Sequence, residues 1–341
     1  MPTPKTPDEH GAGGPGAVRP DAGAASGSSA GRPVRVGRIE FVNCFPLYHH
    51  FERELAARGV AASVVEGYPA ELNRMLVEGA VDVALPSSIA FARDVGELTL
   101  LPHVSISSFG AVDSIQLFTR TPLDRMRRVA LTEKSATSIC LLKVLCREWG
   151  ITPEFAPRRG PLSEVLEDFD ALLLIGDEAL HLLRVEAYPY HFDLGAEWKK
   201  VTGLPMVYAV GAARREFVAA RPAAAAAVGA ALLASRDACA ARPEATAAEA
   251  AQVYDFSQAY LMEYFDKLKF GFAPEYLEGL REFYRRAAAI GELERVPDLD
   301  AVTLASTAAA DQAAAPADAA AASASAPSPG PTPSPGPAGD S

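Results

Sequence analysis

Small polar side chains occur in three loops, each of which follows a predicted strand and precedes a predicted helix. The loops are Asn43-Cys44, Pro86-Ser87-Ser88 and residues 133–138, which include Thr137 and Ser138. In open α/β sheets, ligands bind outside the carboxyl ends of the strands. Hydroxyl and amide side chains, together with the free N–H groups of a helix N-terminus, bind carboxylate or phosphate without an arginine. The three loops therefore predict a site for an anionic small molecule.

Each of these side chains also has a purely structural interpretation. Asn43 is of a type common in turns, and Ser88, Thr137 and Ser138 are of the types that cap helices. For any one hydroxyl, helix capping is the better interpretation. Three such loops in one two-lobed fold favour a ligand instead.

Two further residues are candidates for the same site. Ser114 begins a predicted strand over 114–119, which is expected to leave the first lobe and direct its hydroxyl into the cleft. Asp177 begins a predicted helix, where it would cap the helix, orient another group or contact the ligand; capping is the default. The histidines His49, His50 and His103 have no partner at catalytic spacing, so we interpret them as structural or solvated.

Familiar catalytic and metal motifs are absent from the sequence. It has no glycine-rich phosphate loop, no serine nucleophile elbow and no HExxH pair. The four cysteines lack metal-site spacing, and four thiols in 341 residues do not make a disulfide scaffold. We therefore predict no metal site.

The composition divides the chain into a globular core and two biased ends. The whole chain is 49% hydrophobic and 22% charged, which is typical of a folded protein long enough for two lobes. Residues 1–33 and 304–341 are rich in Gly, Ala, Pro and Ser, and we predict that both are disordered tails. This leaves a core of roughly 270 residues.

The charge and hydropathy limit the possible partners. A formal net charge of −11 argues against a nucleic-acid surface and means that an anionic ligand needs locally placed donors. The N-terminus lacks the apolar segment of a signal peptide, and we find no apolar run long enough to span a bilayer. The alanine-rich run 223–234 better suits a packed helix. We predict a cytoplasmic protein with no nucleic-acid or membrane partner.

Hydrophobic periodicity predicts alternating strands and helices followed by a helical C-terminal third. The first stretch, 36–48, reads as a buried strand that ends near Asn43, followed by a helix from Pro46 to Arg58. Further strands are predicted near 60–65, 81–85, 114–119, 129–132, 154–156, 171–175 and 206–210. Helices are predicted at 69–79, 89–93, 138–149 and 177–184, and through most of 214–289.

This order of elements predicts an α/β fold of the periplasmic binding protein type II class, with a ligand cleft between two α/β lobes. Residues 34–117 plus 208–303 would form lobe 1, and residues 118–207 would form lobe 2. The chain would cross between the lobes near 115–121 and near 205–210. Such folds close around a ligand by a hinge.

Several motifs, in order, resemble the chorismate dehydratases of the futalosine route to menaquinone. The resemblance covers about residues 35–290 and leaves out both tails. Each motif is weak alone, and six in the same order are specific. The motifs are GRIEFVNCFPLY at 37–48, ELNR at 71–74 with GAVDVA at 79–84, SISS at 105–108, VALT at 129–132 with Thr137-Ser138, LIGDEA at 174–179, and LGAEWK at 194–199 with TGLP at 202–205.

The resemblance implies a cofactor-free hydro-lyase that converts chorismate to 3-[(1-carboxyvinyl)oxy]benzoate, here called 3-enolpyruvylbenzoate, and water. In the family, residues matching Asn43 and Ser114 hold the substrate in its reactive pose, and the substrate's enolpyruvyl carboxylate takes the proton. Ser87, Ser88, Thr137 and Ser138 would then hold carboxylates, and Asp177 would contribute to substrate binding. Phe109 replaces a polar residue common in relatives, so the rim around it departs from the family pattern.

Two alternatives share this fold. A non-catalytic solute-binding protein would carry an export signal or lipobox, and we find neither in the sequence. The sister enzyme of the pathway, which forms dihydroxynaphthoate, typically uses a histidine as base. Of the histidines, His103 is the one candidate for a cleft loop, which ranks this enzyme below the dehydratase.

Overall fold

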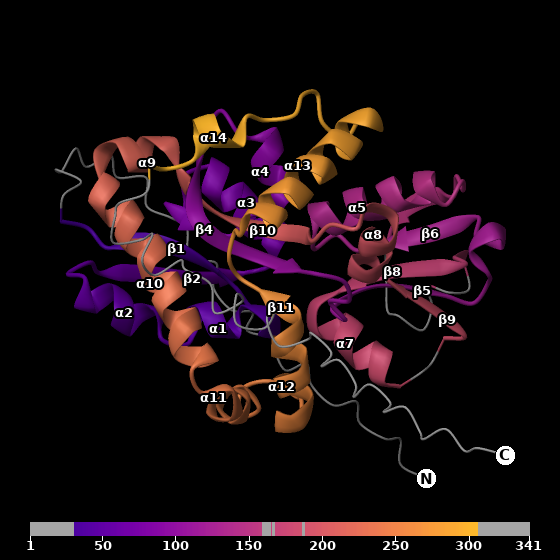
Figure 1. The fold of residues 1–341 in the computed structure, drawn as a ribbon, viewed down its shortest axis with the longest axis horizontal. Helices are drawn as coiled ribbons and strands as arrows, with labels where there is room; N and C mark the ends of the chain where they lie inside the picture. Colours follow the sequence, from indigo (N-terminus) through magenta and orange to yellow (C-terminus); the bar gives the residue numbers. More distant parts are fainter. Residues whose placement is uncertain (1–30, 159–164, 166–167, 186–187, 306–341) are drawn as a thin grey trace, which may run out of the picture. The chain divides into compact units, whose positions relative to one another are not determined.

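The computed structural model describes residues 31–158, 165, 168–185 and 188–305 (Figure 1). Nearly all of the two predicted disordered tails lies outside these residues. At the tail boundaries, the Arg32 guanidinium donates to Asp82 at 3.0 and 3.1 Å, and the Leu304 N–H donates to the Leu100 carbonyl at 2.8 Å. The folded part therefore begins before residue 34 and extends past residue 303.

The first sheet combines parallel and antiparallel strands in the order β11-β4-β10-β3-β1-β2. β1 runs parallel to β2 and β3, whereas β10 runs antiparallel to β3 and β4. This is the sheet that the early βα units predicted. Its strands are β1 (Val34–Ile39), β2 (Ala62–Gly67), β3 (Val83–Ala84), β4 (Leu98–Ser108), β10 (Met206–Arg214) and β11 (Leu268–Lys269).

The second sheet has the order β7-β6-β8-β5-β9. β6 runs parallel to β7 and β8, and β5 runs antiparallel to β8 and β9. Its central strand β8 is buried at every position, as the run of apolar residues predicted. The strands are β5 (Ile115–Thr119), β6 (Arg128–Leu131), β7 (Glu154–Pro157), β8 (Ala171–Ile175) and β9 (Tyr190–Asp193).

The chain changes sheet earlier than the sequence suggested. Ile115 already pairs with Ile175 in the second sheet, and Met206 already pairs with Ser108 in the first. The crossings therefore lie between Ser108 and Ile115 and between Asp193 and Met206. The proposed lobe bounds, after residues 117 and 207, fall a few residues later in the chain, because the apolar pattern alone does not show which sheet a buried strand joins.

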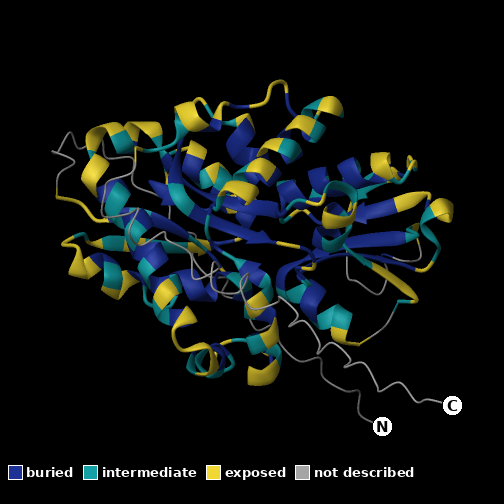
Figure 2. Cartoon of the chain, in the orientation of Figure 1, coloured by how far each residue is buried: buried dark blue, intermediate teal, exposed yellow. Residues whose placement is uncertain are grey.

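Helices cover both sheets and bury most of the inner strands, whereas the edge strands β2, β7 and β9 stay partly exposed (Figure 2). α13 contacts α4, α5 and β10, so it links elements of both sheets. The helices are α1 (Phe45–Tyr48), α2 (Phe51–Ala57), α3 (Pro69–Val77), α4 (Ser88–Arg93), α5 (Ala136–Glu148), α7 (Gly176–Arg184), α8 (Leu194–Thr202), α9 (Arg215–Ala220), α10 (Pro222–Ala240), α11 (Pro243–Ala250), α12 (Gln258–Lys267), α13 (Pro274–Ala289) and α14 (Leu299–Val302), with 3-10 turns η1 (Val42–Cys44) and η2 (Leu123–Arg125).

The predicted helix from Pro46 to Arg58 is broken in two. In an unbroken helix the His50 N–H would donate to the Pro46 carbonyl. Instead, the buried hydroxyl of Ser235 on α10 accepts from the His50 N–H at 2.9 Å and donates to the Pro46 carbonyl at 3.0 Å. A side chain inserted into the hydrogen-bond ladder is a known cause of a kink, and here it separates α1 from α2.

α10 corrects the expectation that no apolar run could span a bilayer. Among the described residues, its 19 residues are long and apolar enough by composition alone. Half of its apolar window is buried, and the helix contacts α1, α2 and β4. These contacts are those of a helix packed in the core of a folded protein.

A buried carboxylate anchors the start of β1. The Asp82 side chain is fully buried and accepts from the Arg35 backbone N–H at 2.9 Å and from the Arg35 and Arg32 guanidinium groups. Burial raises the pKa of Asp82, but these hydrogen bonds outweigh it and hold the pKa below its ordinary value of 3.8. The carboxylate therefore stabilises the fold in its charged form.

Replacing Asp82 with asparagine is expected to lower the free energy of unfolding by about 3 kcal/mol, because two guanidinium groups lose their buried partner. Since the pKa of Asp82 is lowered in the folded state, its contribution is complete at neutral pH and is lost as the pH falls below about 3.8. Urea unfolding at pH 7 and pH 3 measures both effects. Asp300→Asn, at an exposed pair with Arg281, is the control and should change little. An unchanged midpoint in Asp82→Asn would contradict the anchor.

Candidate active site

The first predicted site residue lies in a tight turn immediately after β1. Asn43 occupies the middle of η1, between the buried side chains of Val42 and Cys44. Its Oδ1 is buried and accepts no hydrogen bond from any described residue. An unpartnered buried amide oxygen costs about 1–3 kcal/mol, so such groups in native proteins call for an explanation. A ligand that donates to this oxygen provides one.

Asp177 lies in the first turn of α7, the helix that follows strand β8 of the second sheet, and its side chain contacts η1. Its Oδ1 accepts from the Val42 N–H at 3.1 Å, and it does not cap α7, contrary to the default interpretation. Burial is the largest effect and raises the pKa of Asp177 above its ordinary value. The Val42 N–H, His181 and Lys134 each oppose this rise without cancelling it. This hydrogen bond to Val42 brings Asp177 next to the turn that carries Asn43. Asn43 follows a strand of the first sheet, and Asp177 follows a strand of the second.

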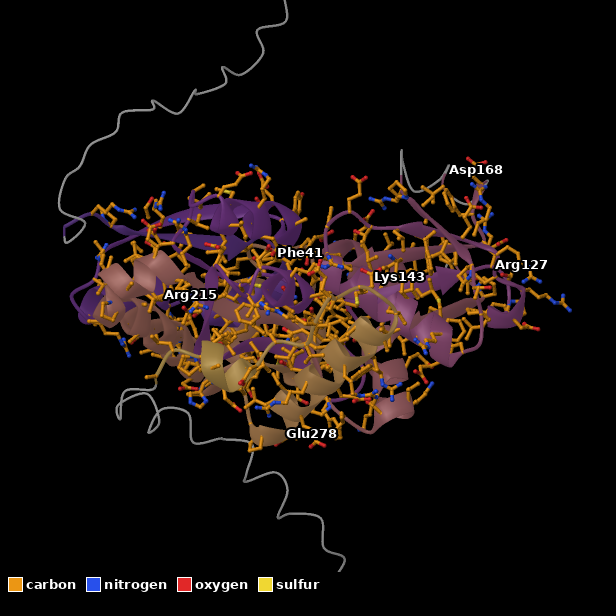
Figure 3. The ribbon with its side chains drawn as sticks, turned by 90° about the horizontal axis from the view of Figure 1, so that it is seen from above. Phe41, Arg127, Lys143, Asp168, Arg215 and Glu278 are labelled. Atoms are coloured by element: carbon orange, nitrogen blue, oxygen red, sulfur yellow. The ribbon has the colours of Figure 1, made fainter. Side chains whose placement is uncertain are left out.

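Gly176 allows this close approach. Its φ is +62°, and a Cβ built on it would lie 2.7 Å from the Phe41 ring. Its N–H donates to the Ser114 carbonyl at 2.8 Å. Phe41, which lies where the indigo and magenta elements meet in Figure 3, therefore packs directly on the start of α7.

Gly176→Ala is expected to destabilise the protein by about 1–3 kcal/mol, because the new methyl group would force the Phe41 ring away and strain a left-handed backbone. Gly59→Ala is a matched control, since Gly59 has a φ of +72° but no atom within 4 Å of the added Cβ. Its cost is the backbone strain alone, about 1 kcal/mol. Thermal unfolding of both variants isolates the ring contact, and equal losses would show that the ring moves without cost.

Ser114 lies in the segment that crosses from the first sheet to the second. It is almost fully buried, and its hydroxyl makes a long hydrogen bond of 3.3 Å to the Val112 carbonyl of its own turn. The segment is fixed by the half-buried carboxylate of Asp193, which accepts from the N–H groups of Val112 and Asp113 and from the Gln116 side chain. Together with Gly176, this fixes the backbone of Ser114 beside Asp177.

The other four candidates form a second group at the start of α4 and α5. The Ser88 hydroxyl donates to the Val207 carbonyl at 2.9 Å and lies 3.2 Å from Thr137 Oγ1, which accepts from the Ile89 N–H. Ser87 precedes α4, and its side chain makes no capping hydrogen bond. The Ser88 and Thr137 hydroxyls therefore join the two helices to each other in this structure.

The cap of α5 is a residue that we did not single out. The Ser135 hydroxyl accepts from the Ser138 N–H at 3.2 Å and lies 3.0 Å from the Ser138 hydroxyl. Neither Thr137 nor Ser138 caps the helix, so the prediction that they are simple helix caps is wrong. The sequence does indicate this cap, because Ser135 immediately precedes the helix and serine is a preferred N-cap residue.

Lys134 connects the two groups of residues. Its ammonium lies 4.5 Å from the Tyr68 ring centroid and 6.0 Å from that of Phe41, and its charge lowers the pKa of Asp177. Sequence reasoning overlooked this lysine because it considered only the small polar residues of the loop. In an acidic protein it is a cation in the right place to attract an anion.

Other expectations concern the rim and the histidines. Phe109 is exposed and lies under the Lys199 ammonium, 3.8 Å from its ring centroid. His103 lies within β4 with a φ of +64°, not in a loop as expected. His181 on α7 opposes the rise in the pKa of Asp177. Its ring stacks on that of Phe256, with 4.4 Å between the ring centroids.

All four cysteines are free and buried. Burial raises the pKa of the Cys44 thiol, beside Asn43, and raises those of Cys140 and Cys146 to about 12. Burial also raises the pKa of Cys239. The thiols therefore stay protonated at neutral pH, and Cys44 is not a nucleophile.

The sequence matches a family model described as menaquinone biosynthesis over residues 34–289. The chain belongs to this menaquinone biosynthesis family. It is 40% identical over 200 residues to a chorismate dehydratase of Thermus thermophilus, covering 54% of this chain and 71% of that one. It is 29% identical over 175 residues to a chorismate dehydratase of Campylobacter jejuni, covering 51% of this chain and 64% of the other. The resemblance found in the sequence is confirmed.

Solved structures show the same fold in binding proteins. The periplasmic aliphatic sulphonate binding protein SsuA of Escherichia coli matches with a TM-score of 0.59 at 14% identity, covering 80% of this chain and 97% of that one. The alkanesulfonate-binding protein SsuA of Xanthomonas axonopodis, bound to MOPS, matches with a TM-score of 0.58 at 14% identity, covering 82% and 99%. The predicted α/β class with two sheets and a periplasmic-binding-protein-like fold is confirmed.

Proposed function

We propose that this protein is a chorismate dehydratase, which converts chorismate to 3-enolpyruvylbenzoate and water. Membership of the menaquinone biosynthesis family and the 40% identity to a chorismate dehydratase support this activity. One structural observation carries the proposed site. Asn43, Ser114 and Asp177 come from three distant parts of the sequence and meet where the two sheets adjoin, and the Asn43 oxygen lacks a partner among the described residues.

The reaction removes a proton and a hydroxyl group from adjacent ring carbons. The proton leaves the carbon that bears the enolpyruvyl ether, the hydroxyl leaves its neighbour, and the two together make water. The ring becomes aromatic, so the step is strongly downhill. If the enolpyruvyl carboxylate takes the proton, as the resemblance implies, the protein needs no base of its own and contributes orientation and exclusion of water.

The site residues then divide by the chemistry they offer. Asn43 and Ser114 are proposed to orient the enolpyruvyl side chain and the departing hydroxyl. Lys134 and the N-terminus of α5, which includes Thr137 and Ser138, would attract a carboxylate. Ser87 and Ser88 would contribute through the start of α4 once the substrate displaces the contact between Ser88 and Thr137.

The test is an incubation of the purified full chain with chorismate, without added metal or cofactor, followed by chromatography of the products. We expect 3-enolpyruvylbenzoate to form in proportion to enzyme, and none with heat-unfolded protein. Binding of chorismate without turnover would favour a solute-binding protein. Conversion of the cyclic futalosine derivative instead would favour the sister enzyme. We also propose a cytoplasmic location, which cell fractionation tests.

A further inference from the structure

A buried tyrosine hydroxyl without a partner lies beside the proposed site. Tyr264 on α12 is 1% exposed, and its hydroxyl makes no hydrogen bond with the part of the chain that the structure describes. The ring itself is well packed, with Tyr260 and Phe265 at centroid distances of 6.4 and 6.0 Å. Phenylalanine would fill the same space without the cost of a desolvated hydroxyl.

The neighbours of this hydroxyl are the proposed site residues. The Ser114 side chain lies beside it and lowers its pKa, although the two hydroxyls do not meet the geometry of a hydrogen bond. Asp177 acts on Tyr264 electrostatically and raises its pKa, and Cys44, the residue after Asn43, is a further neighbour of this hydroxyl. The oxygen of Gln116, two residues after Ser114, is also buried and unpartnered among the described residues. Asn43 Oδ1, Gln116 Oε1 and the Tyr264 hydroxyl, which all lack a partner among the described residues, therefore belong to the segments of the proposed site or to the helix beside it.

The chemistry of the phenol restricts what it can do there. Burial raises its pKa well above 10, so the group is neutral at physiological pH and can donate its proton to a hydrogen bond. A phenol of ordinary pKa, about 10, is a stronger hydrogen-bond donor than water. It is therefore suited to an oxygen that gains negative charge during the reaction.

We propose that the Tyr264 hydroxyl donates a hydrogen bond to the departing hydroxyl oxygen of the substrate. This inference rests on the proposed dehydratase function, in which that oxygen is the atom that gains charge as its bond to the ring carbon breaks. The enolpyruvyl carboxylate takes the ring proton, and the electron pair of the broken C–H bond forms the new ring double bond. The hydroxyl leaves with its bonding electron pair, Tyr264 stabilises its charge, and the protonated carboxyl passes the proton to it, so that water forms and the carboxylate is restored. Asn43 and Ser114 hold the substrate in place.

The test compares two tyrosine-to-phenylalanine variants in chorismate turnover and thermal unfolding. Tyr264→Phe should lower kcat about 10- to 100-fold, the loss expected for a hydrogen bond to a charged oxygen, with KM changed less than about twofold. Its unfolding temperature should stay the same or rise, because an unpartnered hydroxyl is removed. In Tyr48→Phe the Gly37 carbonyl loses its buried donor, which lies 2.9 Å away, so this control should unfold at a lower temperature and keep its kcat.

Each other outcome decides against the inference. A Tyr264→Phe variant with full kcat, or one in which KM rises while kcat is kept, would show that the hydroxyl does not act on the leaving group. A loss of stability like that of Tyr48→Phe would show that the hydroxyl has a structural partner. If the wild-type protein fails to turn over chorismate, the proposed function fails and this inference fails with it. An active wild type with an equally active variant overturns the inference alone.

Discussion

Asn43→Ala should lower kcat for chorismate about 100- to 1000-fold while leaving the protein folded. The Asn43 amide lies in a rigid turn and its buried oxygen has no partner among the described residues, so its removal costs the fold little. A substrate held in a near-attack geometry loses much of its rate when one orienting group is removed. Turnover measured beside far-UV circular dichroism and thermal unfolding checks both parts.

The other asparagine of the chain gives the contrast. Asn73 Oδ1 accepts from the Ser87 N–H at 3.0 Å, so its amide already has a structural partner. Asn73→Ala should therefore lower the unfolding temperature, whereas Asn43→Ala should not. Full turnover in Asn43→Ala would remove Asn43 from the site, and a large loss of stability would assign it to the fold.

Ser114→Ala should lower kcat about 100-fold, because its hydroxyl borders the Tyr264 phenol, while its backbone carbonyl accepts from Gly176, the residue before Asp177. The substitution leaves the contacts that hold this segment unchanged. The Gly176 N–H still donates to the Ser114 carbonyl, and Asp193 still holds the preceding N–H groups. Within the described residues the hydroxyl itself contributes the long hydrogen bond to Val112 and no shorter one, so stability should change little.

Ser105→Ala is the matched control for this serine. Ser105 is equally buried, but its hydroxyl donates to the Gly271 carbonyl at 2.8 Å and lies 2.7 Å from the Ser107 hydroxyl. It should lose stability, by about 1 kcal/mol, and keep its activity. The proposed site is wrong at this position if Ser114→Ala follows the same pattern as Ser105→Ala.

The parts of the fold that sequence predicts well are those set by local pattern. The apolar run Ala171–Ile175 is the strand β8 with the bounds expected, and Pro69 starts α3 where a proline tolerates the first turn. Asn43, Ser114 and Asp177 were proposed from their places at strand and helix ends. Their meeting follows from the sheet topology, which places these ends together.

The parts that sequence missed depend on contacts between distant residues. Ser235 lies 185 residues from His50, and nothing local marks it as the residue that breaks the first helix. Tyr260 and Tyr264 have the four-residue spacing of a packed helix face, so the sequence does not foretell that their hydroxyls lack a partner among the described residues. Lys134 follows Glu133 in a loop with no pattern that marks it, and its place over Tyr68 requires the two sheets to be assembled.

The rate at which the four buried thiols react reports how often the folded protein opens locally. Alkylating reagents attack the thiolate, and a buried thiol with a raised pKa supplies almost none while the protein is folded. The rate of labelling at Cys140, Cys146 and Cys239 therefore measures how often the segment around each cysteine opens to solvent. Cys44 sits one residue from Asn43, so the rate at which iodoacetamide modifies it reports how often the turn after β1 opens, and a ligand that holds the turn shut will slow that rate.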